Sequence, residues 1–134
     1  MKLPKNAVVA VADGETLNLY RNTGDEGSPS LTALPQADVA TTDKGLGGRH
    51  QSSSANPSDR QQDEDSFAAG VATLLNKRVL DGKIDDLVVI AAPRTLGELR
   101  KHYHKSLEAK LTGEIAKDLT GHSAQDIAIA IASA

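Results

Sequence analysis

The residues best placed to do chemistry are acidic groups at the ends of predicted elements. Asp13 follows a predicted buried strand, and an acidic run occupies positions 63–65 at the start of a predicted helix. A two-metal nuclease needs several carboxylates that converge on metal ions, which activate water and stabilise the leaving oxygen. The fourth predicted strand, where a further acid would be needed, ends in Ala91-Ala92-Pro93 instead. Asp13 is better explained by the turn that it begins, so we expect no nuclease.

The histidines and serines do not form a recognisable metal or hydrolase site. His102 and His104 lie two positions apart on a predicted helix and point in different directions, and the other histidines are His50 and His122. The chain has no cysteine, which excludes thiol catalysis, cysteine-ligated zinc and disulfides. The serines gather in a polar segment without the rigid elbow that presents a serine nucleophile. We therefore expect no metal, no cofactor and no enzymatic activity.

Composition excludes further classes of protein. The aromatic residues are Tyr20, Phe67 and Tyr103, too few for a platform on which single-stranded nucleic acid stacks. The net charge of −3 means that the molecule as a whole does not attract polyanions. No stretch approaches the length of a membrane span, and the short apolar run 7–12 resembles a buried strand more than a signal peptide. We expect a cytoplasmic protein that does not engage a membrane.

Hydrophobic patterns predict eight elements in the order β-β-β-α-β-α-β-α. Segments 7–12 and 87–92 have apolar residues on both faces, as strands covered on each side do. Asp13-Gly14 is a hairpin signal, because both central positions of a tight hairpin turn favour positive φ. Pro35 places the third strand at a sheet edge. The other expected elements are strands over 16–22, 31–39 and 115–119 and helices over 64–82, 96–111 and 124–134.

These elements predict one three-layer α/β domain over residues 1–134. Helical crossovers between the buried strands require a parallel centre, while the first hairpin is antiparallel. A mixed five-stranded sheet with strand order 3-2-1-4-5 and helices on both faces satisfies both conditions. This is the arrangement of ribonuclease-H-like domains, and the arrangement alone implies no function.

One edge of the predicted sheet combines fold and chemistry. The C-terminal ends of parallel strands share an edge, where open α/β sheets usually bind ligands. The residues expected at this edge are Asp13, Gly14, Arg94, Thr95, Gly97 and His122. A helix that starts after Thr95, with Arg94 beside it, offers a site for phosphate or carboxylate. We favour the alternative, in which Thr95 and Glu98 form a capping box and Arg94 pairs with Asp13.

The predicted helix 96–111 carries a local excess of positive charge. Its candidate basic face consists of Arg100, Lys101 and Lys105. Such a face would steer RNA or an acidic partner toward a chain that is acidic overall. A solvated helix face with ion pairs between neighbouring turns is the commoner meaning of this pattern.

A long polar segment, 40–63, separates the predicted third strand from the first helix. Leu46 is its only large apolar residue, and the candidate functional loop within it is Gly47-Gly48-Arg49. Such a composition cannot repay the entropy of ordering, so we expect the segment to be mobile in the free protein.

Several runs of residues carry a resemblance to a known family. They are Val9-Ala10-Val11-Ala12-Asp13-Gly14-Glu15, Arg21-Asn22-Thr23-Gly24-Asp25, Asp86-Leu87-Val88-Val89-Ile90-Ala91-Ala92-Pro93, Leu96-Gly97-Glu98-Leu99-Arg100-Lys101-His102 and Lys117-Asp118-Leu119-Thr120-Gly121-His122. With them the chain resembles, over nearly its whole length, the bacterial family named "protein required for attachment to host cells" (host attachment protein). The resemblance implies an α/β domain with a role in attachment.

That family is in turn distantly similar to the middle domain of archaeal and eukaryotic translation release factors. In those domains a Gly-Gly-Gln loop lies between the third strand and the first helix, and Gly47-Gly48-Arg49 occupies the comparable place here. An arginine cannot replace a glutamine that positions water through its side-chain amide. The similarity therefore implies binding to RNA or to a ribosome-like surface in place of peptide release.

We therefore expect a non-enzymatic binding or adaptor domain with an unknown protein partner and an indirect role in attachment to host cells. The alternative is an RNA- or ribosome-associated domain related to the release factor middle domains. RNA binding that weakens steeply with salt would favour the alternative.

Overall fold

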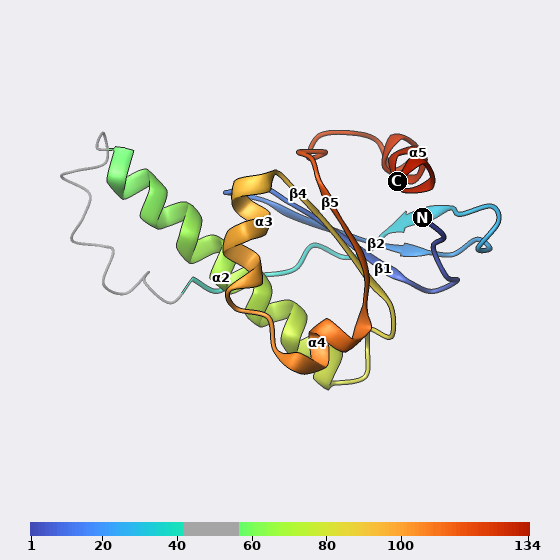
Figure 1. Cartoon of the computed structure of the whole chain (residues 1–134), viewed down its shortest axis with the longest axis horizontal. Helices are drawn as coiled ribbons and strands as arrows, with labels where there is room; N and C mark the ends of the chain where they lie inside the picture. Colours follow the sequence, from blue (N-terminus) through green and yellow to red (C-terminus); the bar gives the residue numbers. More distant parts are fainter. Residues whose placement is uncertain (42–56) are drawn as a thin grey trace.

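The computed structural model describes residues 1–41 and 57–134, which form a five-stranded sheet with helices on both faces (Figure 1). The strand order is β3-β2-β1-β4-β5, as predicted. The strands are β1 (Val8–Ala12), β2 (Leu17–Asn22), β3 (Leu31–Ala33), β4 (Leu87–Ala91) and β5 (Leu111–Ala116). Strand β1 pairs antiparallel with β2 and parallel with β4, and β4 pairs parallel with β5. The expected mixed sheet with a parallel centre is confirmed.

The helices divide between the two faces of the sheet. They are α2 (Pro57–Leu80), α3 (Pro93–Arg100), α4 (Lys105–Lys110) and α5 (Ala124–Ser133). One core cluster joins Val8 and Ala10 of β1 to the helices α2, α3 and α4. The second cluster joins Val9 and Val11 to α5 and to Leu3. Alternate residues of β1 therefore enter opposite cores, which explains why all five are apolar and buried.

The first hairpin differs from its prediction in the position of the turn. Ala12 pairs with Leu17, and the backbone N–H of Asp13 donates to the carbonyl of Thr16 at 3.0 Å. The central turn residues are therefore Gly14 and Glu15, and both have a negative φ. The expected Asp13-Gly14 turn with two positive φ angles is wrong, because the Asp13 side chain stabilises a turn centred one residue later by accepting from the N–H groups of Glu15 and Thr16.

The third strand is shorter than predicted. It ends at Ala33, because Pro35 lacks the N–H that a longer ladder would need. It does lie at the sheet edge, as expected. Residues 34–41, here called the crossing segment, then run from the sheet to α2, with the Gln36 side-chain amide donating to the carbonyl of Leu17 at 2.7 Å. The crossing segment passes α2 at Gly70, where an added Cβ would lie 2.8 Å from Val39 Cγ1.

Helix α2 begins earlier than the polar composition suggested. Pro57 is its first residue, so 57–63 is helical and not part of a loop. Proline suits the first turn of a helix, because the N–H that it lacks would have no partner there. The segment 40–63 was expected to be mobile, and its residues 42–56 lie outside the described part of the chain. At the other end Gly82 closes the helix as predicted, with φ of 77°, and the N–H of Lys83 donates to the carbonyl of Arg78 at 2.9 Å.

The predicted helix 96–111 is two helices, with a turn at 101–104 between α3 and α4. Asn76 of α2 is buried beneath this turn, where its amide donates to the carbonyl of His102 at 2.9 Å and accepts from the N–H of His104 at 3.0 Å. Asn76 therefore supplies hydrogen bonds to backbone groups that lose their helical partners at the break.

The chain enters β5 at Leu111, so the strand expected over 115–119 begins four residues earlier. Gly113 lies inside β5, against the side chain of Met1.

Candidate functional site

The carboxyl edge of the sheet holds Asp13 in a fully bonded turn. One oxygen of its carboxylate, Oδ1, accepts from the backbone N–H groups of Glu15 at 2.8 Å and Thr16 at 2.6 Å, and from the Thr16 hydroxyl at 3.0 Å. Partial burial opposes ionisation, but these bonds, together with the nearby Thr120 hydroxyl, hold the pKa of Asp13 below its usual value. The carboxylate therefore stabilises the hairpin, as the sequence indicated.

The pKa of Asp13 predicts a pH dependence of stability. Because its pKa is lower in the folded chain than in the unfolded chain, the carboxylate stabilises the fold above its ordinary pKa of 3.8, and this contribution is lost as the pH falls through the folded value. We expect Asp13→Asn to lower the free energy of unfolding at about pH 6, and this difference from wild type to shrink toward about pH 2.5. Urea unfolding at several pH values measures it. A difference that stays constant with pH would contradict the assignment.

Two contacts expected of the other edge residues are not made. Helix α3 starts at Pro93 and is capped by Ala92 without a side-chain bond, so Thr95 lies inside the first turn. The predicted capping box of Thr95 is therefore wrong, because Pro93 already fits the first helical position. Arg94 is exposed, and no ion pair within residues 1–41 and 60–134 includes it, so the expected pair with Asp13 is also wrong.

The remaining edge residues make this end of the sheet more acidic than the sequence suggested. The Glu64 side chain from α2 lies against Gly14, where an added Cβ would be 2.7 Å from Glu64 Cγ. Asp118 accepts from the Thr120 hydroxyl at 2.5 Å, and His122, just before α5, lies 3.9 Å from Asp126 in the first turn of that helix. The carboxylates of Asp13, Glu64 and Asp118 at this end of the sheet disfavour a phosphate there. Within the part of the chain that the structure describes, no group of acidic or histidine side chains could hold a metal ion.

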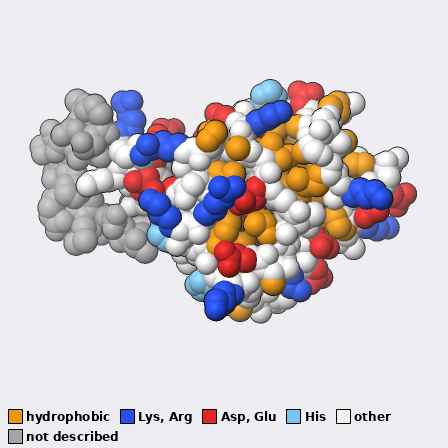
Figure 2. All heavy atoms as spheres, in the orientation of Figure 1, with side chains coloured by type: hydrophobic (Ala, Val, Ile, Leu, Met, Phe, Trp, Pro, Cys, Tyr) orange, Lys and Arg blue, Asp and Glu red, His pale blue; other side chains and the backbone are white. Residues whose placement is uncertain are grey.

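The predicted basic face is largely neutralised. The Arg100 guanidinium donates to Glu114 Oε1 from Nε at 3.0 Å and from Nη2 at 2.7 Å, and Lys101 pairs with Glu98 at 3.2 Å. Lys105 is exposed and belongs to the separate helix α4. Figure 2 shows positive and negative side chains interspersed over this side of the molecule, without a continuous basic patch. The commoner meaning of the charge pattern, a solvated face with ion pairs, fits Arg100 and Lys101.

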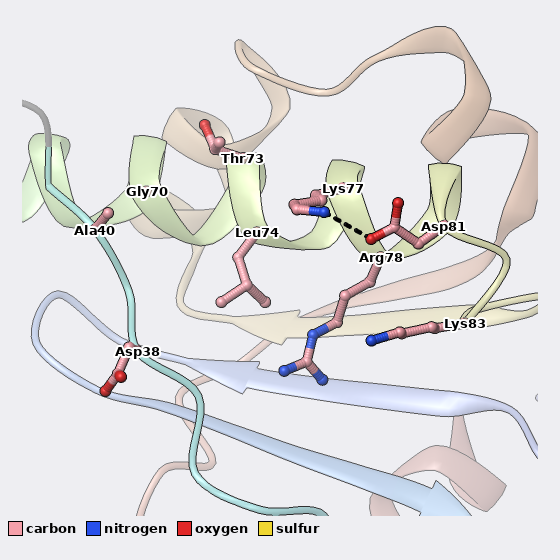
Figure 3. Close-up of a pocket in the computed structure, with 9 residues that line it drawn as sticks. All are labelled: Asp38, Ala40, Gly70, Thr73, Leu74, Lys77, Arg78, Asp81 and Lys83. Atoms are coloured by element: carbon pink, nitrogen blue, oxygen red, sulfur yellow. Dashed lines mark hydrogen bonds and ion pairs between the residues drawn. The ribbon is translucent and has the colours of Figure 1, made fainter.

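A pocket that the sequence did not indicate lies between the crossing segment and the C-terminal half of α2 (Figure 3). Its volume is about 340 Å³, and we call it the α2 pocket. Its lining residues are Asp38, Ala40, Gly70, Thr73, Leu74, Lys77, Arg78, Asp81 and Lys83. Lys77 and Asp81 pair at 2.8 Å, and this bond lowers the pKa of Asp81. The signal in the sequence was three cations, at 77, 78 and 83, close to the helix end that Gly82 closes.

Arg78 and Lys83 are the pocket's unpaired cations. No ion pair between residues that the structure describes in full includes either of them. Figure 3 shows Leu74, Arg78 and Lys83 on the side of α2 that faces the crossing segment, while Thr73 points away. Gly70 and Leu74 give the pocket an apolar wall, so it combines free positive charge with an apolar surface.

A model of bacterial archaeo-eukaryotic release factor family 12 matches residues 6–131. The chain belongs to this family. The match supports the release factor part of the resemblance seen in the sequence, whereas nothing in the comparisons supports a host attachment protein. None of the curated proteins matches the chain.

Membership of family 12 agrees with the observed strand order, which is that expected for a release-factor-like domain. The candidate loop Gly47-Gly48-Arg49 lies outside the described residues, so its geometry adds nothing to the site. Within the described ranges no helix of this family 12 chain is long and apolar enough to cross a membrane.

Proposed function

We propose that this family 12 domain binds RNA, free or within a ribosome, and carries out no reaction of its own. The observation that carries the proposal is the family match over residues 6–131, since it includes every strand and nearly all of the last helix. RNA or ribosome association was the alternative function that the sequence left open. We place the domain in the cytoplasm, where ribosomes are found.

Charge supports an RNA-binding role only if it is local. The chain has a net charge of −3, so its overall field repels a polyanion. The α2 pocket carries three cations and two carboxylates, one of each in the Lys77–Asp81 pair, and so has a local excess of positive charge. A local cationic site on an acidic protein binds RNA at low salt, and its affinity for RNA falls as the salt concentration rises.

Peptide release is not part of the proposal. The loop that would have to position water carries Arg49 after its two glycines, and an arginine has donors only, whereas a glutamine amide offers both a donor and an acceptor. A host attachment role is not retained as a second candidate, because no observation favours it over RNA binding.

Filter binding of labelled total RNA across a salt series tests the proposal. We expect measurable binding at about 50 mM salt, with an affinity that falls linearly on logarithmic axes as salt rises, because binding releases counterions. A variant with Lys101→Gln should bind as wild type within about threefold, because Lys101 is paired with Glu98 and does not line the α2 pocket. Absence of RNA binding at the lowest salt would overturn the proposed function.

A further inference from the structure

We propose that the α2 pocket binds a backbone phosphate of a single RNA strand, with Arg78 and Lys83 as the ligating cations. This inference rests on the proposed function and names the surface that performs it. It differs from the sequence-derived candidates, since it uses neither the carboxyl edge of the sheet nor the face of 96–111.

The end of α2 brings the two cations together. Gly82, with φ of 77°, reverses the chain, and the N–H of Lys83 bonds to the carbonyl of Arg78 at 2.9 Å. The two side chains therefore leave the same helix end on the same side, as Figure 3 shows. Gly82 has open space around it, so its role is to provide this reversal, and no packing requires a glycine there.

The chemistry of the pocket fits a phosphate better than a base. None of its lining residues is aromatic, so a base has no ring on which to stack. A guanidinium offers paired N–H donors that match two phosphate oxygens, and the Lys83 ammonium adds a second charge. Arg78 is half-buried, so its stem is held against the protein and loses little freedom on binding. The apolar wall at Leu74 and Gly70 offers a surface for the ribose.

A purely structural role of these cations makes a different prediction. Basic side chains in the last turn of a helix stabilise its negative end. Such a role would change the melting temperature and leave RNA binding untouched. RNA affinity and its salt dependence therefore separate the two roles.

The test compares two double variants with equal loss of charge. Arg78→Gln with Lys83→Gln empties the pocket of free cations, while Lys105→Gln with Lys110→Gln removes two exposed cations of α4. Binding of a fluorescent 12-nucleotide single-stranded RNA is followed by anisotropy across a salt series, and folding of each variant is checked by circular dichroism and melting. The pocket variant should bind about tenfold more weakly at low salt, with a salt slope smaller by about 0.7, because one phosphate contact to a single strand contributes about that much. The α4 variant should keep the wild-type slope.

Asp38→Asn provides a test that does not depend on losing a cation. Asp38 is an exposed carboxylate of the pocket lining, so its neutralisation should strengthen RNA binding about threefold. A change of fold could not produce this gain.

The outcomes separate this inference from the function on which it rests. If wild type binds RNA but the pocket variant keeps its affinity and slope, or Asp38→Asn leaves binding unchanged, the inference is overturned and the proposed function stands. A lowered melting temperature with an unchanged slope assigns the cations to the helix end and also overturns it. If wild type binds no RNA at all, both are overturned.

Discussion

Replacing Asn22 with alanine is expected to lower the free energy of unfolding by about 4 kcal/mol. Asn22 has no exposed surface, and its amide group connects three segments of the chain. Nδ2 donates to the carbonyls of Leu3 at 3.0 Å and Pro4 at 3.2 Å, and Oδ1 accepts from the N–H groups of Gly24 and Ser30, both at 3.0 Å. Alanine would remove these bonds from the Leu3 carbonyl and from the N–H groups of Gly24 and Ser30, at a cost of roughly 1–3 kcal/mol for each group left buried without a partner. The Pro4 carbonyl would keep its bond from the N–H of Ala7 at 3.1 Å.

Chemical denaturation of wild type and Asn22→Ala measures this loss. Asn18→Ala is the matched control, because Asn18 lies on the same strand and takes part in no side-chain hydrogen bond recorded among the described residues. The control should change the free energy of unfolding by less than about 1 kcal/mol. If both variants lost the same small amount, the bonds of Asn22 would not hold the three segments together.

Gly70→Ala should destabilise the protein by about 2–3 kcal/mol, although alanine favours a helix by about 1 kcal/mol over glycine. The added Cβ would meet the carbonyl oxygen of Ala40 and lie 2.8 Å from Val39 Cγ1. A backbone oxygen cannot swing aside as a flexible side chain can, so the crossing segment must move away from α2. Because Ala40 and Gly70 both line the α2 pocket, the substitution should also distort that pocket.

Gly97→Ala is the internal control for this prediction, since Gly97 is also a helical glycine and has nothing within 4 Å of an added Cβ. It should gain up to about 1 kcal/mol from helix propensity alone. Thermal melting of both variants gives the comparison. A Gly70→Ala protein that melts at or above the wild-type temperature would show that the crossing segment does not require the bare backbone of α2.

The sheet could be predicted from the sequence because its two central strands consist of continuous apolar runs. Every residue of Val8–Ala12 and Leu87–Ala91 is apolar and buried, so pattern and environment agree. The final helix, expected over 124–134, begins where local sequence fixes it, since the Ser123 hydroxyl accepts from the N–H of Asp126 at 3.1 Å and caps it. Strand order then followed from the crossovers and the hairpin.

The sequence did not predict the helix boundaries that depend on residues distant in the chain. The apolar stripe of Leu96, Leu99 and Leu107 is compatible with one long helix, and the break after α3 depends on Asn76, a buried residue of α2. The start of α2 at Pro57 gave no signal, because its early turns are polar and mostly exposed from residue 60 to 63. Periodicity detects a helix only where one face is buried.

The candidate site was the least predictable part. Its lining combines residues 38 and 40 with residues 70–83, and only the path of the crossing segment brings them together. The positive charges on 96–111 predicted a basic face, yet Glu114, from strand β5, neutralises Arg100. A charge count along the chain does not show which cations lack a partner in the fold.

Co-sedimentation with isolated ribosomes is the most direct test of RNA binding by this domain. The chain should pellet with ribosomes at about 50 mM salt and return to the supernatant as salt rises, and the variant with Arg78→Gln and Lys83→Gln should be released at lower salt than wild type. Added total RNA should compete for the wild-type chain. A chain that stays in the supernatant with ribosomes at the lowest salt, and that retains no RNA on a filter, would contradict the account.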